Sequence, residues 1–190
     1  MSRRPRTVLL SFSAFLAASG MMLSACSEKQ SGPVVVSVIG TPRQLADPMR
    51  DILSPAGKLM LESTAQGLVA FDARGDILPA LAQRWIVQDD GRSYIFRLRR
   101  ARWANGARIK AVDVAALLKN RIAANLALDS HGDLAAIQEV SSMTGEVLEI
   151  RLSVPRPYLL QMLAQPQMAI TRRDGGTGPY RKEKRGEAWF

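Results

Sequence analysis

The spacing of hydrophobic residues changes along the chain, and this spacing constrains the fold more than any other feature. In residues 93–99, after an Asp-Asp-Gly turn, large apolar side chains alternate with mostly polar ones, which is typical of a half-buried strand. Residues 111–128 instead carry apolar side chains at helical spacing and predict an amphipathic helix. Alternation returns at residues 148–152. The spacing therefore predicts strands on both sides of a long helix.

Turn-forming residues separate shorter elements on either side of these segments. The β-branched run at 34–39 predicts a strand that is buried on both faces. Gly67 is expected to mark the end of a helix, and Asp, Gly and Pro residues punctuate the segments that follow. The remaining expectations are loops at 40–48 and 77–81, helices at 55–63 and 158–164, strands at 68–71, 85–88, 137–140 and 168–170, and turns at 72–76 and 103–106.

The composition is that of a folded chain with a surplus of positive charge. Of the 190 residues, 47% are hydrophobic and 23% are charged, which fits a globular domain and excludes a disordered chain. The formal net charge is +9, and basic residues cluster at 97–102 and 172–185. These clusters allow two interpretations, a phosphate-binding surface or solvated strand edges and a solvated tail. Because no nucleic-acid-binding motif accompanies them, we favour the second and expect no nucleic-acid partner.

The N-terminal residues predict export from the cytoplasm. Arg3, Arg4 and Arg6 precede an apolar stretch at 7–23, which serines interrupt and which is too short for a membrane-spanning helix. We expect residues 1–25 to be a signal peptide and 26–33 to be a polar tether. The folded domain then comprises residues 34–190.

The junction Leu23-Ser24-Ala25-Cys26 resembles the lipobox of bacterial lipoproteins. In that family the chain is cleaved before the cysteine, which is then acylated. The resemblance therefore implies that Cys26 is a lipid attachment site and that the lipid anchors the protein to a membrane. The alternative is that Cys26 is simply a small hydrophobic residue. Because it is the only cysteine, the chain can form neither an intrachain disulfide nor a cysteine cluster that binds a metal.

No segment has the pattern of a catalytic site. His131 is the only histidine, and it lies in a polar, turn-like stretch that is typical of a surface loop. Asp89 and Asp90 precede Gly91 between two expected strands, so a hairpin turn explains them better than acid–base catalysis. The glycines at 175–178 lack the Gly-Lys-Ser/Thr ending of a phosphate-binding loop. We therefore expect a protein that is not an enzyme and that holds no cofactor or metal.

Eight short motifs follow one another along the chain between residues 42 and 180. Residues 89–99 read Asp-Asp-Gly-Arg-Ser-Tyr-Ile-Phe-Arg-Leu-Arg, close to the pattern Asp-Asp-Gly-Lys-Thr-Tyr-Thr-Phe-x-Leu-Arg. The other motifs lie at 42–48, 66–69, 78–85, 103–106, 111–114, 155–160 and 176–180. In this order they resemble extracellular solute-binding proteins of the peptide-binding class, the dipeptide and oligopeptide receptors of bacterial ABC importers.

The resemblance implies a periplasmic-binding-protein-like fold of type II, an α/β fold with a mixed sheet and flanking helices. Residues 34–190 would form a partial solute-binding domain, the N-terminal lobe segments of the usual two-lobed fold. The implied function is that of a lipid-anchored substrate-binding component of an ABC importer in the periplasm or cell envelope. It would capture a peptide or similar small solute by cleft closure and deliver it to permease subunits.

The resemblance also bears on individual residues. It points to Arg50 and Asp51 as ligand-binding residues of the groove, because they follow the motif at 42–48; a solvated loop is the alternative. Lys110 stands where the family commonly has threonine, so the helix at 111–128 is expected to begin without a side-chain cap.

Two alternatives to transport stay open. The motifs cover only the first part of such a receptor, so the chain is expected to be either a fragment of a longer receptor or a truncated, non-binding remnant or repurposed envelope lipoprotein. An envelope hydrolase is the other alternative, and it would have to use His131.

Overall fold

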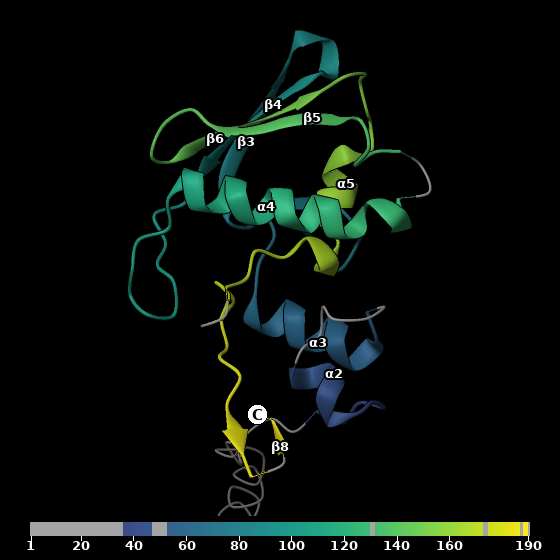
Figure 1. The fold of residues 1–190 in the computed structure, drawn as a ribbon, viewed down its shortest axis with the longest axis vertical. Helices are drawn as coiled ribbons and strands as arrows, with labels where there is room; N and C mark the ends of the chain where they lie inside the picture. The colour runs from purple at the N-terminus through teal and green to yellow at the C-terminus, as the bar shows by residue number, and fades with distance from the viewer. Residues whose placement is uncertain (1–35, 47–52, 130–131, 173–174, 187, 190) are drawn as a thin grey trace, which may run out of the picture. The chain divides into compact units, whose positions relative to one another are not determined.

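The computed structural model describes residues 36–46, 53–129, 132–172, 175–186 and 188–189. The chain divides into two units, Met1–Ser37 and Val38–Phe190. Only Val36 and Ser37 of the first unit are described, so the fold reported below is that of the second unit (Figure 1).

A four-stranded antiparallel sheet forms the centre of this unit. In space the order is β3 (Ala82–Gln88), β4 (Ser93–Leu98), β6 (Val147–Leu152) and β5 (Ile137–Ser142). Short connections join β3 to β4 and β5 to β6, and such hairpins impose antiparallel pairing. The α/β class is confirmed. Among the described strands, however, no pair is parallel, so the parallel pairing of a mixed sheet is not found there.

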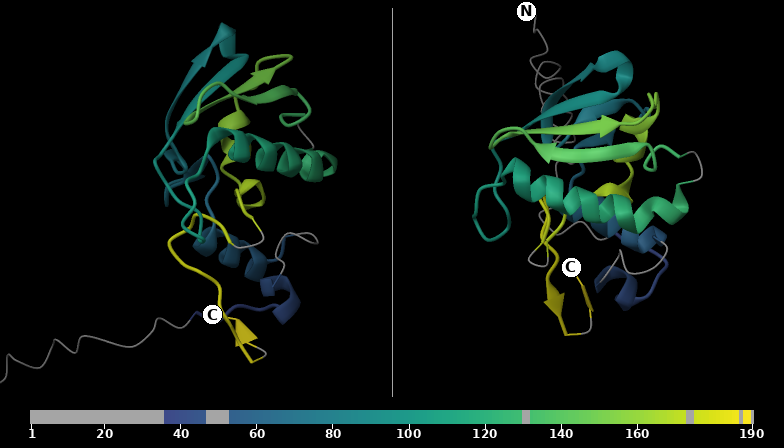
Figure 2. Two further views of the ribbon diagram at one scale, coloured as in Figure 1. Left: turned by 60° about the vertical axis from the view of Figure 1, so that its left-hand side comes forward. Right: turned by 45° about the horizontal axis from the view of Figure 1, so that its top comes forward.

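The long helix α4 (Ala111–Asn125) covers one face of the sheet (Figures 1 and 2). The expected alternation in β4 is confirmed, because Tyr94, Phe96 and Leu98 are buried whereas Arg97 is exposed. From α4, β5 and β6 the same core contains Val114, Ala115, Leu118, Ile122, Val140, Leu148, Ile150 and Leu152. The core therefore lies between α4 and the sheet.

Both ends of α4 follow from its sequence. Lys110 is the N-cap residue, and its side chain makes no capping hydrogen bond, as expected. The α-helical part stops at Asn125, and the 3₁₀ turn η2 (Leu126–Leu128) continues to the expected end.

The connection between β3 and β4 is the 3₁₀ turn η1 (Asp89–Gly91). Asp89 and Asp90 both have φ 52°, and Gly91 has φ 84°. Aspartate tolerates this left-handed region better than most residues, and glycine adopts it freely. The interpretation of the two aspartates as a hairpin turn is confirmed.

A second, two-stranded sheet pairs β1 (Val69–Phe71) with β2 (Ile77–Pro79). In the turn between them, the Asp72 carboxylate accepts hydrogen bonds from two backbone N–H groups at 2.7 and 2.9 Å. Because β2 occupies residues 77–79, the expectation of a loop at 77–81 is wrong for these three residues. Pro79 ends β2, a position at the strand margin where the missing N–H is tolerated.

The chain before α3 also differs from expectation. Residues 36–39 form no strand, and Ile39 is 96% exposed, because no described strand pairs with this run. The segment expected to be a loop contains α2 (Pro42–Ala46). Proline suits the first turn of a helix, where its missing N–H has no partner to lose. The side-chain oxygen of Gln44 also accepts the N–H of Thr41 at 2.8 Å.

The expected strand at 168–170 is wrong as well. The 3₁₀ turn η3 (Pro166–Met168) takes its place, and only a single bridge follows it, in which Ile170 N–H donates to the Gln66 carbonyl oxygen at 2.9 Å. The expected helices at 55–63 and 158–164 are confirmed. The remaining elements are α3 (Pro55–Thr64), α5 (Leu159–Leu163), β7 (Lys184–Arg185) and β8 (Ala188–Trp189).

Candidate functional site

The residues that the sequence singles out for binding lie outside the described residues. Cys26 belongs to 1–35, and Arg50 and Asp51 belong to 47–52, the connection between α2 and α3. Their roles as lipid attachment site and groove residues stay predictions. His131 also lies outside the described residues.

The end of α3 closely approaches the segment that carries the Gly-Thr-Gly-Pro-Tyr motif. Gly178 N–H donates to the Thr64 carbonyl oxygen at 3.0 Å, and Tyr180 N–H donates to the Ser63 carbonyl oxygen at 3.1 Å. Both acceptors lie in the last turn of α3, where helical carbonyl groups have no partner within the helix. The motif at 176–180 is thereby placed against the end of the helix that precedes the motif at 66–69.

Two glycines make this approach sterically feasible. A Cβ atom on Gly178 would lie 2.3 Å from the Thr64 carbonyl carbon, and one on Gly176 would lie 2.6 Å from the Ala65 Cβ. Neither position has room for a side chain. The phosphate-cradle interpretation of these glycines gains no support, because the Gly178 N–H already donates to α3.

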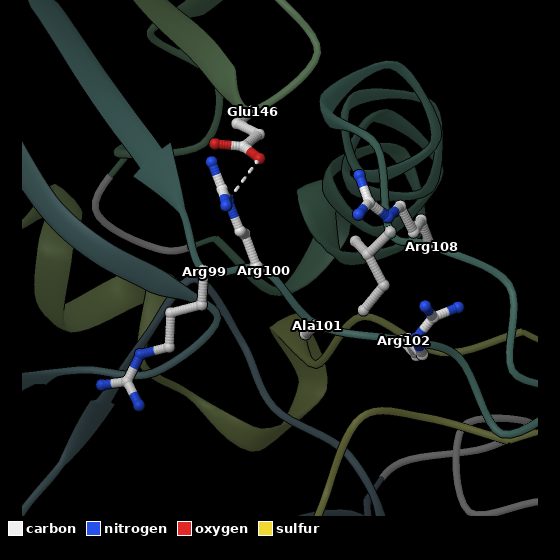
Figure 3. Close-up of a pocket in the computed structure, with 7 residues that line it drawn as sticks. Arg99, Arg100, Ala101, Arg102, Arg108 and Glu146 are labelled. Atoms are coloured by element: carbon white, nitrogen blue, oxygen red, sulfur yellow. Dashed lines mark ion pairs between the residues drawn. The ribbon is translucent and has the colours of Figure 1, made fainter.

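A pocket of about 230 Å³ opens at the end of β4, where the chain leads toward α4. Its lining residues are Arg99, Arg100, Ala101, Arg102, Arg108, Ile109 and Glu146. We call it the arginine pocket. In Figure 3, Arg100 points toward Glu146, Arg102 and Arg108 lie to one side, and Arg99 points away. The backbones of Arg102 and Arg108 form an antiparallel bridge, which fixes these two residues opposite each other.

Positive charge exceeds negative charge in and around the arginine pocket. The Glu146 carboxylate forms ion pairs with Arg100 at 3.3 Å and with Arg97 at 3.7 Å. Arg102 donates only to a neutral acceptor, a carbonyl oxygen of its own turn at 2.7 Å. Among the described residues, the Arg108 side chain has no hydrogen-bond or ion-pair partner. The single carboxylate thus leaves several guanidinium charges uncompensated.

The second basic cluster begins with an anchored arginine. The Arg172 guanidinium lies 4.6 Å from the centroid of the Trp103 ring, and its Nη2 is 3.9 Å from Asp113 Oδ1. Trp103 is itself only 2% exposed and starts the expected turn at 103–106. For Arg172, the interpretation as part of a solvated tail is therefore wrong.

Asp129 organises the turn at 132–136, which precedes β5. Its carboxylate accepts hydrogen bonds from the N–H groups of Asp133, Leu134 and Ala135 at 3.1, 2.7 and 3.0 Å. Burial raises the pKa of Asp129, but the backbone N–H groups outweigh burial and hold the pKa below its ordinary value. Asp129 therefore has a structural role in this turn.

The described part of the chain shows neither a metal-binding cluster nor a membrane-spanning helix. It contains no group of three or more His, Cys, Asp or Glu residues that could hold a metal ion. None of its helices combines the length and the apolar character needed to cross a membrane.

Three residues that line the arginine pocket were not predicted from the sequence: Arg108, Ile109 and Glu146. A signal for Arg108 was present, since Arg102 and Arg108 flank the turn at 103–106 and pair across it. Glu146 offered no such signal, because it comes from the turn before β6 and reaches the pocket only through the fold.

A protein-family comparison covers the region just described. The family model described as "Bacterial extracellular solute-binding proteins, family 5 Middle" matches residues 76–188. This range contains the four-stranded sheet, α4 and the arginine pocket, and it is more than half of the chain.

Individual proteins agree with this match. The Escherichia coli (strain K12) protein named "Probable deoxycholate-binding periplasmic protein YgiS" is 31% identical over 140 residues, which are 64% of this chain and 26% of that protein. NikA from Brucella suis, solved in complex with Fe(III)-EDTA, has a TM-score of 0.65 and 23% identity over 74% of this chain and 32% of its own. Peptide-bound OppA of Listeria monocytogenes has a TM-score of 0.64 and 20% identity over 82% and 36%.

The chain thus spans about a quarter of the length of the curated relative and about a third of the two solved structures. Over that length the likenesses confirm the expected periplasmic-binding-protein-like α/β fold. The matched family is one of extracellular binding proteins, not of enzymes. The extent of the match shows that the chain belongs to the bacterial extracellular solute-binding proteins of family 5.

Proposed function

We propose that this chain forms part of the substrate-binding component of an ABC importer for peptides or related small solutes. The observation that carries the proposal is the match of residues 76–188 to the solute-binding family. The protein would hold its solute between two lobes that close around it, and it would release the solute to a permease. Binding and release need no covalent chemistry.

Peptides are the ligand class that we favour. Two of the structural neighbours, the OppA proteins of Haemophilus influenzae and Listeria monocytogenes, are bound to peptides. Within the chain, Arg50 and Asp51 stand next to each other with opposite charges. A guanidinium and a carboxylate suit the carboxylate and the ammonium group of a zwitterionic peptide. The name of the Escherichia coli relative points to deoxycholate as a second ligand to test.

Peptide binding can be measured by calorimetric titration of the protein recovered from its native cell envelope, with peptides of two to nine residues and with deoxycholate. The double variant Arg50→Gln/Asp51→Asn is expected to bind peptide at least about tenfold more weakly. Lys58→Gln/Glu62→Gln is the matched control, because these residues form an exposed ion pair on α3 at 3.8 Å. We expect the control to change affinity less than about twofold.

The outcomes separate the parts of the proposal. Peptide binding that is equally strong in both double variants would contradict the assignment of Arg50 and Asp51. A protein that binds deoxycholate but no peptide would contradict the peptide class. Failure to bind any of these solutes would contradict the solute-binding function itself.

We further propose that a lipid on Cys26 holds the protein in the cell envelope. The lipobox-like junction supports this, and a multiply acylated cysteine gives stable membrane attachment. Intact mass spectrometry of the membrane fraction should detect acyl groups on the wild type and on Ser27→Ala. The variant Cys26→Ser should lose both the acyl mass and the membrane association. Retention of Cys26→Ser in the membrane fraction would contradict lipid anchoring.

A further inference from the structure

The arginine pocket contains more cationic side chains than the stability of the fold explains. Arg97, Arg99, Arg100, Arg102 and Arg108 are all exposed, and Glu146 is the one carboxylate that lines the pocket. Like charges held close together repel, and each exposed guanidinium gains little from the fold. Such a cluster stabilises an anion that enters it.

The geometry directs an anion to one side of the pocket. The Glu146 carboxylate forms ion pairs with Arg97 and Arg100, so these two guanidinium groups already have an anionic partner. Arg102 and Arg108 carry no carboxylate partner among the described residues, and the antiparallel bridge holds them opposite each other. The bridge thus presents two guanidinium groups from one tight turn.

Three backbone N–H groups of this turn already donate within the protein and are not free to bind an anion. Trp103 N–H donates to the Ala107 carbonyl oxygen at 2.9 Å, Gly106 N–H to that of Trp103 at 2.9 Å, and Ile109 N–H to that of Ala101 at 3.1 Å. Recognition at the pocket therefore rests on guanidinium groups, which favours a charged ligand over a neutral solute.

We propose that the arginine pocket binds a phosphate group, taken either from free inorganic phosphate or from the headgroup of an anionic phospholipid. A tetrahedral phosphate presents oxygens in several directions and can accept from Arg102 and Arg108 together, whereas a planar carboxylate matches a single guanidinium fork. This proposal does not depend on the peptide groove proposed above.

The test uses the full chain with Cys26→Ser, so that no acyl chain contributes to membrane binding. One arm titrates inorganic phosphate by calorimetry at constant chloride concentration, with acetate as the carboxylate comparison. The other arm measures co-sedimentation with vesicles of phosphatidylglycerol and phosphatidylcholine, compared with phosphatidylcholine alone. Both arms are run on two charge-matched double variants.

The pocket variant is Arg102→Gln/Arg108→Gln. The control is Arg43→Gln/Arg92→Gln, because Arg43 is exposed and forms no ion pair with a described residue, and Arg92, like Arg102, donates to a backbone carbonyl oxygen. We expect the pocket variant to weaken binding at least about tenfold and the control to weaken it less than about threefold. Circular dichroism melting should show that both variants stay folded, since all four side chains are exposed.

If the pocket variant, but not the control, loses only the binding of inorganic phosphate, the ligand is free phosphate. If it loses only the binding of vesicles that contain phosphatidylglycerol, the ligand is the lipid headgroup. The proposal is overturned if neither ligand binds, if both double variants lose binding equally, or if acetate binds as tightly as phosphate. Equal losses would mean that net charge alone attracts anions.

Discussion

Replacing Gly178 by alanine tests how the motif at 176–180 is attached to α3. The added Cβ would lie 2.3 Å from the Thr64 carbonyl carbon and 2.5 Å from the Ala65 nitrogen, whereas ordinary contact begins at 3.4 Å. Both neighbours are backbone atoms, one in the last residue of α3 and one in its C-cap residue, so they cannot rotate away as a side chain could. Gly178 is not among the glycines with positive φ, so the alanine itself meets no backbone strain.

The segment has two ways to respond to this alanine. If it stays in place, overpacking costs about 1–3 kcal/mol. If it detaches, it loses the hydrogen bonds from Gly178 to Thr64 and from Tyr180 to Ser63, which together contribute about 1–3 kcal/mol. Either response predicts that the free energy of unfolding of Gly178→Ala falls by about 1–3 kcal/mol.

Urea denaturation of the full chain, followed by tryptophan fluorescence, measures this difference. Gly145→Ala is the control, because no atom lies within 4 Å of its added Cβ and its φ is not positive; we expect it to be neutral or to stabilise slightly. Hydrogen exchange at the Tyr180 amide reports detachment directly. A Gly178→Ala protein with unchanged stability and an unchanged Tyr180 exchange rate would refute the close approach of this segment to α3.

Three further predictions concern local interactions. The pKa of Asp129 is lower in the folded protein than in the unfolded chain, so its charged form stabilises the fold at a pH above the unfolded-state pKa, and this stability is lost as the pH falls through the folded-state pKa. Asp129→Asn should therefore narrow the difference between the urea midpoints at pH 7 and pH 3. An unchanged difference would contradict this role. The Glu149 carboxylate, whose side chain is 9% exposed, accepts from Ser93 Oγ at 2.7 Å and from Arg151 Nε at 3.0 Å. Arg151→Met should therefore lower the free energy of unfolding, and it should lower it less when Glu149→Gln is also present, as a double-mutant cycle by urea denaturation would show; equal effects in both backgrounds would contradict the coupling. Asp90→Val should lower stability by about 1–2 kcal/mol because of its positive φ, whereas Asp90→Asn should leave the melting temperature nearly unchanged; equal melting temperatures for both would contradict the turn conformation.

The candidate site illustrates the limit of local patterns. A processing signal such as the junction before Cys26 is a short sequence pattern, so the chain alone predicts it, and no fold is needed to recognise it. Arg50 and Asp51 came from a motif position and stay predictions. The arginine pocket could be predicted only in part, because the cluster at 97–102 is contiguous but Glu146 joins it from a distant turn.

Elements whose signal is local could be predicted from the amino-acid sequence. The alternation of β4, the turn at 89–91 and the helical spacing of α4 each extend over a few neighbouring residues, and each is confirmed. The family motifs, which are also local, led to the correct fold family.

Tertiary structure alone decided features that need a distant partner. The β-branched run at 36–39 has strand composition, yet it forms no strand because a strand requires a neighbour for its backbone hydrogen bonds. The contact of Gly178 with Thr64 likewise joins residues far apart in the chain, and such contacts depend on how the whole chain packs, which no short window of sequence contains.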